Sequence, residues 1–538
     1  MNAERLRVLA PGLLAFAIYL PSLNGRFLYD DIGNIAENRA LAAGLESALR
    51  HEPSRPLLGL TWAANHAWSG LDAWSYHLVN ALIHGINALL VGSLLLWMAR
   101  RAGRPHPEAS ALLAACWFAV TPMAVETVAY VSSRSTALCS LFMLASLRLA
   151  IDFLADGERR GRLAAALGLY VLALLSKEEA AALPLLLLLI DVFFVPGRTA
   201  RQRLGAAAPF ILLPVLGLVA RRFATGAWLP PLVLDRGIYL VTQAAAFPLY
   251  LVRSAFPFDP AFFRGHPPSA WPPDAATLLF AGVGLGLVAG AATLRGRWPT
   301  AAFAVLWMAA SLVPSSSLVP LREMVVDHRA YLGGVAVCYA LGGLLWGPGR
   351  QVFALGLIAL LAARCIQYQR VVGDPIRAWE DAVSRADLSG EAWRGLGGAY
   401  GDAGDGRAEA ALQRAVQLGS ADAQSWGNLG VYYLSKQRRE DAEQALRHAV
   451  AAAPHDSRIR DNLALLLESE GRPEEALLEY EAAARGRPPI AQPRVRLALL
   501  LIERGDTERA RQWLEEAAAL EIDAEDARLI EAARARLP

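Results

Sequence analysis

Two adjacent acids, Asp30 and Asp31, follow the first hydrophobic segment of the chain. That segment, residues 6–23, is long enough to cross a bilayer at a helical rise of about 1.5 Å per residue. Arg5 and Arg7 precede it, and basic residues before a first span indicate a cytoplasmic start. We therefore predict that the acid pair emerges at the opposite membrane surface. Carboxylates held there can deprotonate a hydroxyl or ligate a divalent cation, although an Asp pair is also common at the start of a solvated loop.

Further charged residues are predicted at the same membrane surface, where charge is costly and usually functional. The candidate cations are Arg55, Arg134, Lys177 and Arg329, and the acids near them are Glu126 and Glu178. Arginine binds a phosphate through two parallel hydrogen bonds, and lysine binds it as a point charge. Each residue by itself is more often an anchor at a helix end. Together they describe a site in which acids lie beside cations, which suits a lipid-phosphate sugar donor and a hydroxyl acceptor.

The second hydrophobic segment carries a polar stripe. Its members are His77, Asn80, His84 and Asn87, spaced by three or four residues. This spacing places them on one face of a helix. A single histidine would more often be structural, but four polar groups on one membrane stripe must face protein or a cavity. We therefore include His77, Asn80 and His84 among the residues expected to line a cavity.

The composition indicates an integral membrane protein with a soluble part. Of 538 residues, 55% are hydrophobic and 19% are charged, and the mean hydropathy is +0.31. A net charge of +2 is too small to indicate nucleic-acid binding. The four cysteines fall in apolar segments, which argues against a disulfide framework or a zinc site.

About eleven spans are predicted before residue 370. After residues 6–23, the apolar segments lie at about 77–99, 109–124, 136–151, 163–175, 180–195, 206–220, 274–294, 300–320, 331–346 and 351–368. Segment 238–256 contains Pro248 and Arg253 and is predicted to be interfacial or re-entrant. Alternate loops carry arginines, which predicts that these loops and the N-terminus are cytoplasmic. An odd number of spans then places the C-terminal part in the periplasm of an inner-membrane protein, and a twelfth span would reverse that placement.

The chain changes character near residue 370, where we predict a boundary between a membrane domain, 1–370, and a soluble domain, 371–538. A period of about 34 residues appears after residue 390. Trp393 and Trp426 each begin the pattern W-x2-L-G-x2-Y, which is the tetratricopeptide signature. We predict about four repeats, each a pair of antiparallel helices. The fold class is therefore all-α: a polytopic membrane helical domain followed by a tetratricopeptide solenoid.

Repeats of this kind usually bind peptides on a concave face. Asn428 and Asn462 occupy equivalent positions, two residues after the Trp position, from which a side chain can reach that face. They are candidates for holding the backbone of an extended peptide. Asparagine at this position can equally stabilise helix packing. Gly395 and Arg496 interrupt the series in the outer repeats.

Ordered motifs along the whole chain resemble a known family. They read Phe27-Leu28-Tyr29-Asp30-Asp31, Arg55-Pro56-Leu57, Tyr76-His77 with Asn80 and His84, Pro122 with Glu126 and Arg134, and Ser176-Lys177-Glu178, followed by the repeats. This series is similar to that of the transmembrane O-mannosyltransferases with tetratricopeptide repeats and their bacterial relatives, which are glycosyltransferases of the GT-C class.

The resemblance implies transfer of a sugar from a polyprenyl-phosphate carrier to an extracytoplasmic protein. The first-loop acids, with Glu126, would act on the acceptor, and the basic residues would bind the donor phosphate; Asp31 is our preferred base. A divalent cation is an open possibility, without a readable ligand set. Relatives usually carry His-Pro-x-His before the Glu, whereas this chain has Thr121 and Ala124 at the two histidine positions. They usually carry E-R-Y-x-Y near the tenth span, whereas this chain has Asp327-His328-Arg329-Ala330-Tyr331.

Two other functions remain open from the sequence. The first is a non-catalytic scaffold, in which the repeats recruit partners of an envelope or pilus assembly; the two missing histidines favour it. The second is a transporter of lipid-linked sugars. It fits less well, because the charged residues are predicted at the outer surface, whereas transporter sites usually lie at the bilayer midplane.

Overall fold

The computed structural model describes residues 3–51, 53–156, 160–225, 234–265, 272–316, 320–321, 323–419, 422–520 and 524–537. All regular elements among them are helices, as the sequence predicts. The chain divides into two compact units. The first contains Met1–Ala36 and Glu52–Asp374, and the second contains Glu37–His51 and Pro375–Pro538. The division therefore falls close to residue 370, and the short segment Glu37–His51 joins the second unit.

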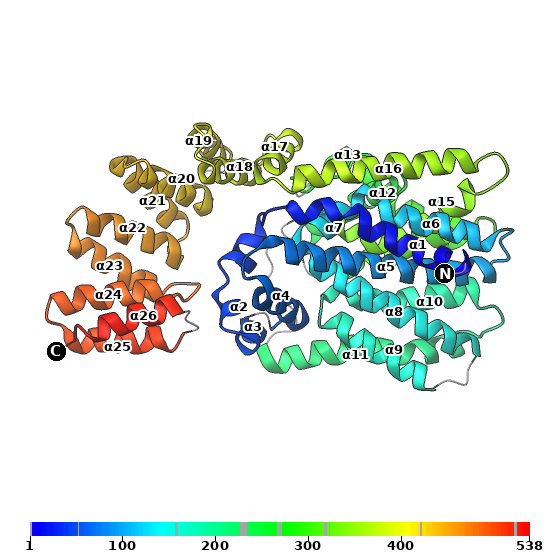
Figure 1. The fold of residues 1–538 in the computed structure, drawn as a ribbon, viewed down its shortest axis with the longest axis horizontal. Helices are drawn as coiled ribbons and strands as arrows, with labels where there is room; N and C mark the ends of the chain where they lie inside the picture. Colours follow the sequence, from blue (N-terminus) through cyan, green and yellow to red (C-terminus); the bar gives the residue numbers. More distant parts are fainter. Residues whose placement is uncertain are drawn as a thin grey trace. The chain divides into compact units, whose positions relative to one another are not determined.

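The first unit is a helical bundle (Figure 1). Its α-helices are α1 (Ala3–Ile18), α4 (Pro56–Ser69), α5 (Ala73–Arg101), α6 (Pro107–Val120), α7 (Val125–Ala129), α8 (Arg134–Asp156), α9 (Arg160–Leu174), α10 (Leu183–Phe194), α11 (Ala200–Thr225), α12 (Arg236–Ala255), α13 (Ala275–Thr293), α14 (Pro299–Leu312), α15 (Ala330–Leu345) and α16 (Gln351–Val372). Short helical turns connect several of them: η1 (Leu20–Asn24), η2 (Ile32–Ala36), η3 (Pro122–Ala124), η4 (Val131–Ser133), η5 (Glu178–Ala182) and η6 (Asp327–Arg329).

Five described helices are long and apolar enough to cross a membrane: α5, residues 131–154 around α8, residues 200–223 of α11, α13 and α16. A sixth candidate is the pair formed by Pro107–Val120 and Pro122–Ala129, which bends by 47°. Pro122 explains the bend, because proline cannot continue the hydrogen-bond ladder of a helix. The remaining predicted spans form shorter helices, so the count of about eleven stays a prediction. Segment 238–256 forms α12, a continuous helix that is not among the candidate spans.

Helix α5 lies against α1, α6 and α8 in the middle of the bundle (Figure 1). Its polar stripe is buried between these helices, as a stripe of costly groups in a membrane helix requires. His84 contacts the Tyr331 hydroxyl at 2.7 Å and the Ala119 carbonyl at 3.1 Å. Asn87 donates to the Ala137 carbonyl at 3.0 Å. The stripe therefore ties α5 to α6, α8 and α15.

The second unit is an array of helix pairs. Its helices are α2 (Arg39–Ala42), α3 (Leu45–His51), α17 (Pro375–Arg385), α18 (Gly390–Asp402), α19 (Ala408–Leu418), α20 (Ala423–Ser435), α21 (Arg439–Ala452), α22 (Ser457–Ser469), α23 (Pro473–Ala484), α24 (Ala491–Glu503), α25 (Thr507–Ala518) and α26 (Ala524–Arg534). From α18 to α25 they form four pairs, which confirms the tetratricopeptide prediction.

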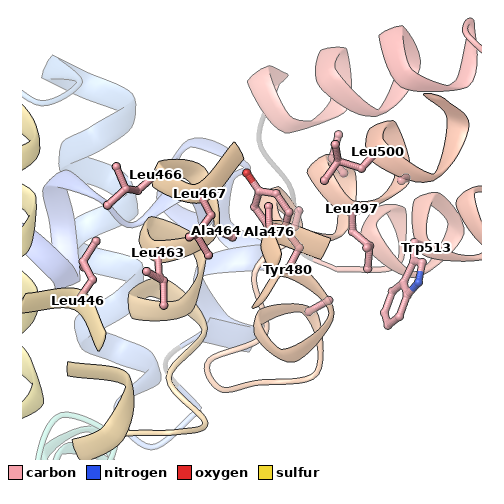
Figure 2. Packing of buried hydrophobic residues seen from close by; sticks show 14 of the residues in the cluster. Leu446, Leu463, Ala464, Leu466, Leu467, Ala476, Tyr480, Leu497, Leu500 and Trp513 are labelled. Atoms are coloured by element: carbon pink, nitrogen blue, oxygen red, sulfur yellow. The ribbon is translucent and has the colours of Figure 1, made fainter. Parts of the chain in front are cut away.

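Large side chains fill the space between the paired helices and between neighbouring pairs (Figure 2). Leu463 and Leu497, one repeat apart, are 1% and 0% exposed. The small residues Ala464 and Ala498 beside them are also fully buried and let the helix backbones approach. The repeat signature thus records a packing pattern, which explains why the sequence predicts this unit so directly.

Candidate functional site

A cavity of about 320 Å³ lies in the first unit, among residues brought together from six segments of the chain. Its lining residues are Tyr29, Asp30, Arg55, Glu126, Tyr130, Ser132, Ser133, Ser135, Lys177, Glu178, Glu179, Phe262, Phe263, Leu321, Glu323, His328 and Arg329. Six residues singled out from the sequence are among them: Asp30, Arg55, Glu126, Lys177, Glu178 and Arg329. The bundle therefore gathers acids and cations that the sequence separates by up to about 300 positions.

The two adjacent acids have different surroundings. Asp30 lines the cavity, whereas Asp31 is 1% exposed and does not line it. The Asp31 carboxylate accepts hydrogen bonds from the Leu28 N–H at 3.1 Å, the Ser132 N–H at 2.7 Å and the Ser132 hydroxyl at 2.6 Å. Burial raises the pKa of Asp31 to about 7, although these hydrogen bonds oppose the change. Asp31 thus fastens the first loop to η4.

The backbone turn before the pair determines which acid reaches the cavity. Tyr29 has a φ of +54°, in the left-handed region that a residue with a bulky side chain rarely adopts. Such conformations concentrate at functional sites, where the surrounding structure holds them. Here the Tyr29 and Tyr130 rings both pack edge-on against Phe262. The Asp30 N–H donates to the Tyr130 hydroxyl at 3.1 Å, so the turn is held from both sides.

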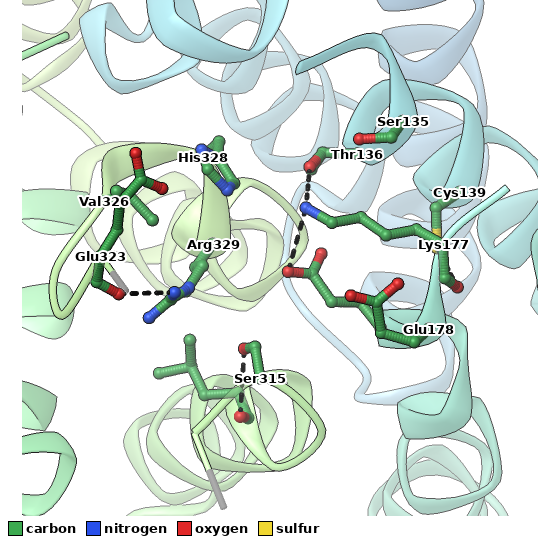
Figure 3. A network of polar contacts seen from close by, with 12 residues as sticks. Ser135, Thr136, Cys139, Lys177, Glu178, Ser315, Glu323, Val326, His328 and Arg329 are labelled. Atoms are coloured by element: carbon green, nitrogen blue, oxygen red, sulfur yellow. Dashed lines mark hydrogen bonds and ion pairs between the residues drawn. The ribbon is translucent and has the colours of Figure 1, made fainter. Parts of the chain in front are cut away.

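Two buried cations face each other across part of this site. Figure 3 shows the Lys177 side chain extending toward the turn that carries His328 and Arg329. Lys177 is 6% exposed, donates to the Thr136 hydroxyl at 2.7 Å and pairs with Glu179 at 3.2 Å. Arg329 is 5% exposed and donates to the carbonyl oxygens of Glu323 at 2.8 Å and Met324 at 3.1 Å. These carbonyl acceptors are neutral and leave the guanidinium charge in place.

A third cation, Arg55, contributes from the start of α4. It pairs with Glu178 across the cavity rim, with the closest approach, 2.9 Å, between Arg55 Nη2 and Glu178 Oε1. Both side chains are partly exposed, at 33% and 56%. An exposed pair of this kind exchanges partners at little cost, because the net free energy of a surface ion pair is small.

Glu126 and His328 form a buried pair on the cavity wall. Glu126 is 4% exposed and accepts the His328 N–H at 2.9 Å, while its other carboxylate oxygen lies 2.7 Å from His328 Nδ1. Burial, together with the charges of Lys177 and Arg329, lowers the pKa of His328 well below its usual range. Burial, together with the charge of Asp327, raises the pKa of Glu126 to about 8, so the two groups share a hydrogen bond in a site that disfavours charge on both. Glu126 positions the turn of His328 and Arg329.

Two contributors to this turn were not predicted from the sequence. Neither His328 nor Arg264 was among the candidate site residues. The Arg264 guanidinium binds the Asp327 carboxylate through Nε and Nη2, each at 2.8 Å, and both side chains are buried. The Ala261 N–H donates to the same carboxylate at 2.9 Å. This bidentate contact anchors η6, but no local pattern marks Arg264 as its partner.

Several sequence-based candidates lie away from the cavity. Arg134 is 0% exposed, and its guanidinium donates to Asn80 Oδ1 at 2.6 Å, Asn65 Oδ1 at 2.7 Å and the Tyr76 carbonyl at 2.9 Å. Every nitrogen of the guanidinium is thereby used within the protein. We accordingly replace its predicted role in phosphate binding by a structural one.

The members of the polar stripe on α5 also do not line the cavity, in contrast to our expectation. Asn80 accepts from Arg134 and donates to the Val128 carbonyl at 3.1 Å. His77 and His84 are 1% and 0% exposed and are packed between helices. The spacing correctly placed these groups on one helix face, but protein rather than a cavity covers that face.

The positions of Thr121 and Ala124 are separate from the main cavity as well. Both line a small cavity of about 20 Å³ between Phe118, Met123 and the start of α15. The two altered histidine positions therefore lie apart from the acids and cations around Asp30, whereas the second departure from the family pattern includes His328 and Arg329 of the main cavity.

The repeat candidates, Asn428 and Asn462, lie on α20 and α22, the first helices of successive pairs, and both are partly exposed. The structure also explains why Gly395 and Arg496 replace asparagine at the equivalent positions of the outer repeats. A methyl group on Gly395 would overlap the Trp379 ring of α17, so no side chain fits there. Arg496 instead forms an ion pair with Asp461 of the preceding repeat.

Among the described residues, no group of three or more His, Cys, Asp or Glu side chains has an arrangement that could hold a metal ion. The possibility of a divalent cation raised by the sequence thus has no ligand set of this kind in the described parts of the chain.

Comparison with known proteins relates the chain to protein O-mannosyl-transferases. It is 36% identical over 162 residues to Protein O-mannosyl-transferase TMTC4 of Homo sapiens, a match that covers 26% of this chain and 22% of that protein. It is 31% identical over 201 residues to Protein O-mannosyl-transferase Tmtc1 of Drosophila melanogaster, covering 34% and 22% respectively. The chain thus spans less than a quarter of the length of these relatives.

The repeat unit is recognised independently. Residues 423–456, which comprise α20 and α21, match the tetratricopeptide repeat family. The alignment with the crystal structure of MamA covers 30% of this chain and 89% of the MamA chain, at 22% identity and a TM-score of 0.25. The chain is thus similar over part of its length to the O-mannosyl-transferases, and it carries a tetratricopeptide repeat.

Proposed function

We propose that this protein is a membrane glycosyltransferase of the GT-C class. It transfers a sugar from a polyprenyl-phosphate carrier to a hydroxyl group of an extracytoplasmic protein, which the repeats recruit. The single observation that carries this proposal is the cavity that holds Asp30 together with two buried cations, Lys177 and Arg329. The printed names of the relatives support the same reaction class.

We assign the role of general base to Asp30 in place of Asp31. Asp30 lines the cavity, whereas Asp31 is buried and its carboxylate accepts three hydrogen bonds from the protein. The Asp30 carboxylate accepts the proton of the acceptor hydroxyl, and the hydroxyl oxygen bonds to the anomeric carbon of the sugar. The bond between that carbon and the phosphate oxygen breaks, and the polyprenyl phosphate leaves with both bonding electrons.

Lys177 and Arg329 stabilise the departing phosphate. Negative charge develops on the leaving oxygen during the reaction, and cations already held in a buried site stabilise it without reorganisation. Arg329 suits this role because its assigned acceptors are carbonyl oxygens, which hold the guanidinium in place and leave its charge available. Arg55 shifts from Glu178 to the phosphate when the donor enters.

The scaffold hypothesis is weakened by the location of the altered histidine positions. Thr121 and Ala124 line the separate small cavity, so their change leaves the acids and cations of the main cavity intact. A scaffold has no need to keep a buried lysine and a buried arginine beside an acid, because buried charge is costly to stability.

The proposal is tested with Asp30→Asn in the full chain. Removing the base lowers the rate of sugar transfer by about 10²–10⁴-fold while leaving folding intact, because asparagine keeps the shape of the aspartate side chain. Transfer is measured in native membranes by mass spectrometry of envelope glycoproteins. The matched control, Asp72→Asn, alters an exposed acid outside the cavity and keeps full activity. Unchanged glycan profiles in the Asp30 variant would refute the enzyme function.

Donor binding is tested separately with Arg329→Gln and Lys177→Gln. Each variant raises the KM for the lipid-linked donor and lowers kcat, because the cations contact the phosphate both before and during transfer. An unchanged KM and kcat in both variants would contradict the assignment of phosphate binding.

A further inference from the structure

A second cavity, of about 420 Å³, lies at the other end of α15 from the candidate site. Its lining residues are Arg104, Pro105, His106, Ser110, Thr300, Ala301, Ala340, Gly343, Leu344 and Trp346. They come from the α5–α6 connection, the start of α6, the first turn of α14 and the end of α15. From Arg329 to Gly343 the helical rise amounts to about 21 Å, so the two cavities lie at opposite ends of the bundle.

Arg104 is held rigidly on the wall of this cavity. Its guanidinium carbon lies 3.6 Å from the centroid of the Tyr339 ring, and Nη1 donates to the Tyr339 carbonyl at 2.9 Å. Gly343 makes this position possible, since a methyl group there would lie 2.5 Å from Arg104 Nη1. An arginine that merely anchors a helix end extends into water. Arg104 instead lies over an aromatic ring and beside a glycine.

The charge of Arg104 is not balanced within the cavity. Among the described residues that line it, none is acidic. The nearby acid Glu108 pairs with Arg100 at 2.9 Å. The carbonyl oxygen of Tyr339 orients the guanidinium without neutralising it. The first turns of α6 and α14 also border the cavity, and the positive ends of their helix dipoles add to its attraction for an anion.

Apart from His106, Ser110 and Thr300, the rest of the wall is apolar. Ala301, Ala340, Leu344 and Trp346 present hydrocarbon surface beside the guanidinium. Leu344 is 61% exposed, and Trp298, just before α14, is 57% exposed. Exposed tryptophan is typical of the level of lipid headgroups. A fixed cation bordered by apolar surface matches a ligand with one anionic group and a hydrocarbon part.

We propose that this cavity binds the phosphate group of an anionic amphiphile, such as a phospholipid headgroup, at the membrane face opposite the candidate active site. Arg104 binds the phosphate oxygens, while Leu344 and Trp346 contact the hydrocarbon chains. Basic pockets between membrane helices are known to bind anionic headgroups in this way. The site is separate from the proposed sugar transfer, because it shares no lining residue with the cavity around Asp30.

The test uses the full chain purified in a neutral detergent and titrated with phosphatidylglycerol or with phosphatidylcholine, with bound lipid counted by native mass spectrometry. The wild-type protein retains phosphatidylglycerol at least about fivefold better than phosphatidylcholine. This ratio corresponds to the preference of about 1 kcal/mol that is expected for one cation near an anionic headgroup. Arg104→Gln abolishes the preference by removing the charge. Ala301→Phe abolishes it by filling the cavity from an exposed position in the first turn of α14.

The matched control is Arg101→Gln, which removes a neighbouring charge that stacks on Trp97 and does not line the cavity; this variant keeps the preference. If inorganic phosphate displaces the bound phosphatidylglycerol, a soluble phosphate is sufficient to occupy the cavity. If it does not displace the lipid, the ligand is a lipid. If Arg104→Gln fails to fold, the lipid preference of the Ala301→Phe variant tests the proposal. Equal retention of the two lipids by the wild type, or an unchanged preference in a folded Ala301→Phe variant, would overturn the proposal.

Discussion

At the scale of single residues, burial separates the groups that can act on a ligand from those that hold the structure. Asp30 and Asp31 are adjacent and chemically identical, yet only Asp30 lines the cavity. Arg134 and Arg329 are both buried arginines, but Arg134 donates to side-chain and backbone acceptors from every nitrogen, whereas Arg329 lines the cavity. Residue type therefore identifies candidates, and the surroundings assign their roles.

Arg134 is expected to control stability and not donor affinity. Arg134→Gln leaves buried acceptors on Asn65, Asn80 and Tyr76 without donors, which costs about 3 kcal/mol or more of folding free energy. Thermal unfolding in detergent measures this loss as a lower melting temperature. A variant with wild-type stability and a raised KM for the donor would instead support the phosphate-binding role predicted from the sequence.

Asp31 is expected to make stability depend on pH. Its pKa is about 7 in the folded protein against an ordinary value of 3.8, so the folded state retains a proton that the unfolded chain has released between these values. Its contribution to stability is therefore complete below about pH 4 and is lost as the pH rises through about 7. Melting temperatures of the wild type should fall more steeply from pH 5 to pH 8 than those of Asp31→Asn. Parallel curves would contradict this account.

At the scale of helices, small residues decide how closely elements approach. Gly430 on α20 faces α21, and a methyl group there would lie 2.7 Å from Leu446 Cγ. Gly397 has the same relation to Leu412 on α19, while the later repeats carry Ala464 and Ala498 at this position. The glycine of the repeat signature thus marks a close contact between paired helices.

Gly430→Val should push α20 and α21 apart and destabilise the protein by about 1–3 kcal/mol, because overpacking forces side chains and backbone to shift. The control is Gly427→Ala on the same helix. A methyl group there lies 3.6 Å from Ile459 Cγ1, an ordinary contact, so this variant should be neutral or stabilised through its higher helix propensity. Circular dichroism during heating of the full chain measures both. Equal stability of the two variants would show that the packing argument is incorrect.

At the scale of the whole molecule, the number of spans determines on which side of the membrane the repeats lie. Five described helices, or six with the bent pair, meet the length and composition of a span, and the other apolar helices of the first unit are shorter. The loop charges still favour about eleven spans, a cytoplasmic N-terminus and periplasmic repeats. This orientation is part of our proposal, since it brings the repeats to the side on which the acceptor is modified.

The orientation is tested by fusing a reporter that is active only in the periplasm after residue 372. We expect an active reporter when the fusion point follows residue 372. We expect an inactive reporter when the fusion point follows residue 103, in the α5–α6 connection. An inactive reporter at both points would mean that α12 or another helix after residue 103 adds a span, and reversed results at both points would mean that the N-terminus is periplasmic; in either case the proposed recruitment of periplasmic acceptors would fail.

The sequence by itself determined the features that depend on local periodicity. The repeat spacing predicted paired helices, and the motif W-x2-L-G-x2-Y predicted which residues fill the space between them. The spacing of His77, Asn80, His84 and Asn87 predicted a single polar helix face. Each of these follows from the 3.6-residue turn of a helix, which local sequence reveals directly.

Only the tertiary structure decided which polar residues share a cavity. It joined Glu126 to His328 over 202 positions and Arg264 to Asp327 over 63, and it covered the polar face of α5 with protein. Such contacts depend on which helices pack together and on how a single strained residue, Tyr29, turns the chain. The energy of a buried charge is determined by neighbours far away in the sequence, so the choice between Asp30 and Asp31 as the proposed base rests on the folded bundle.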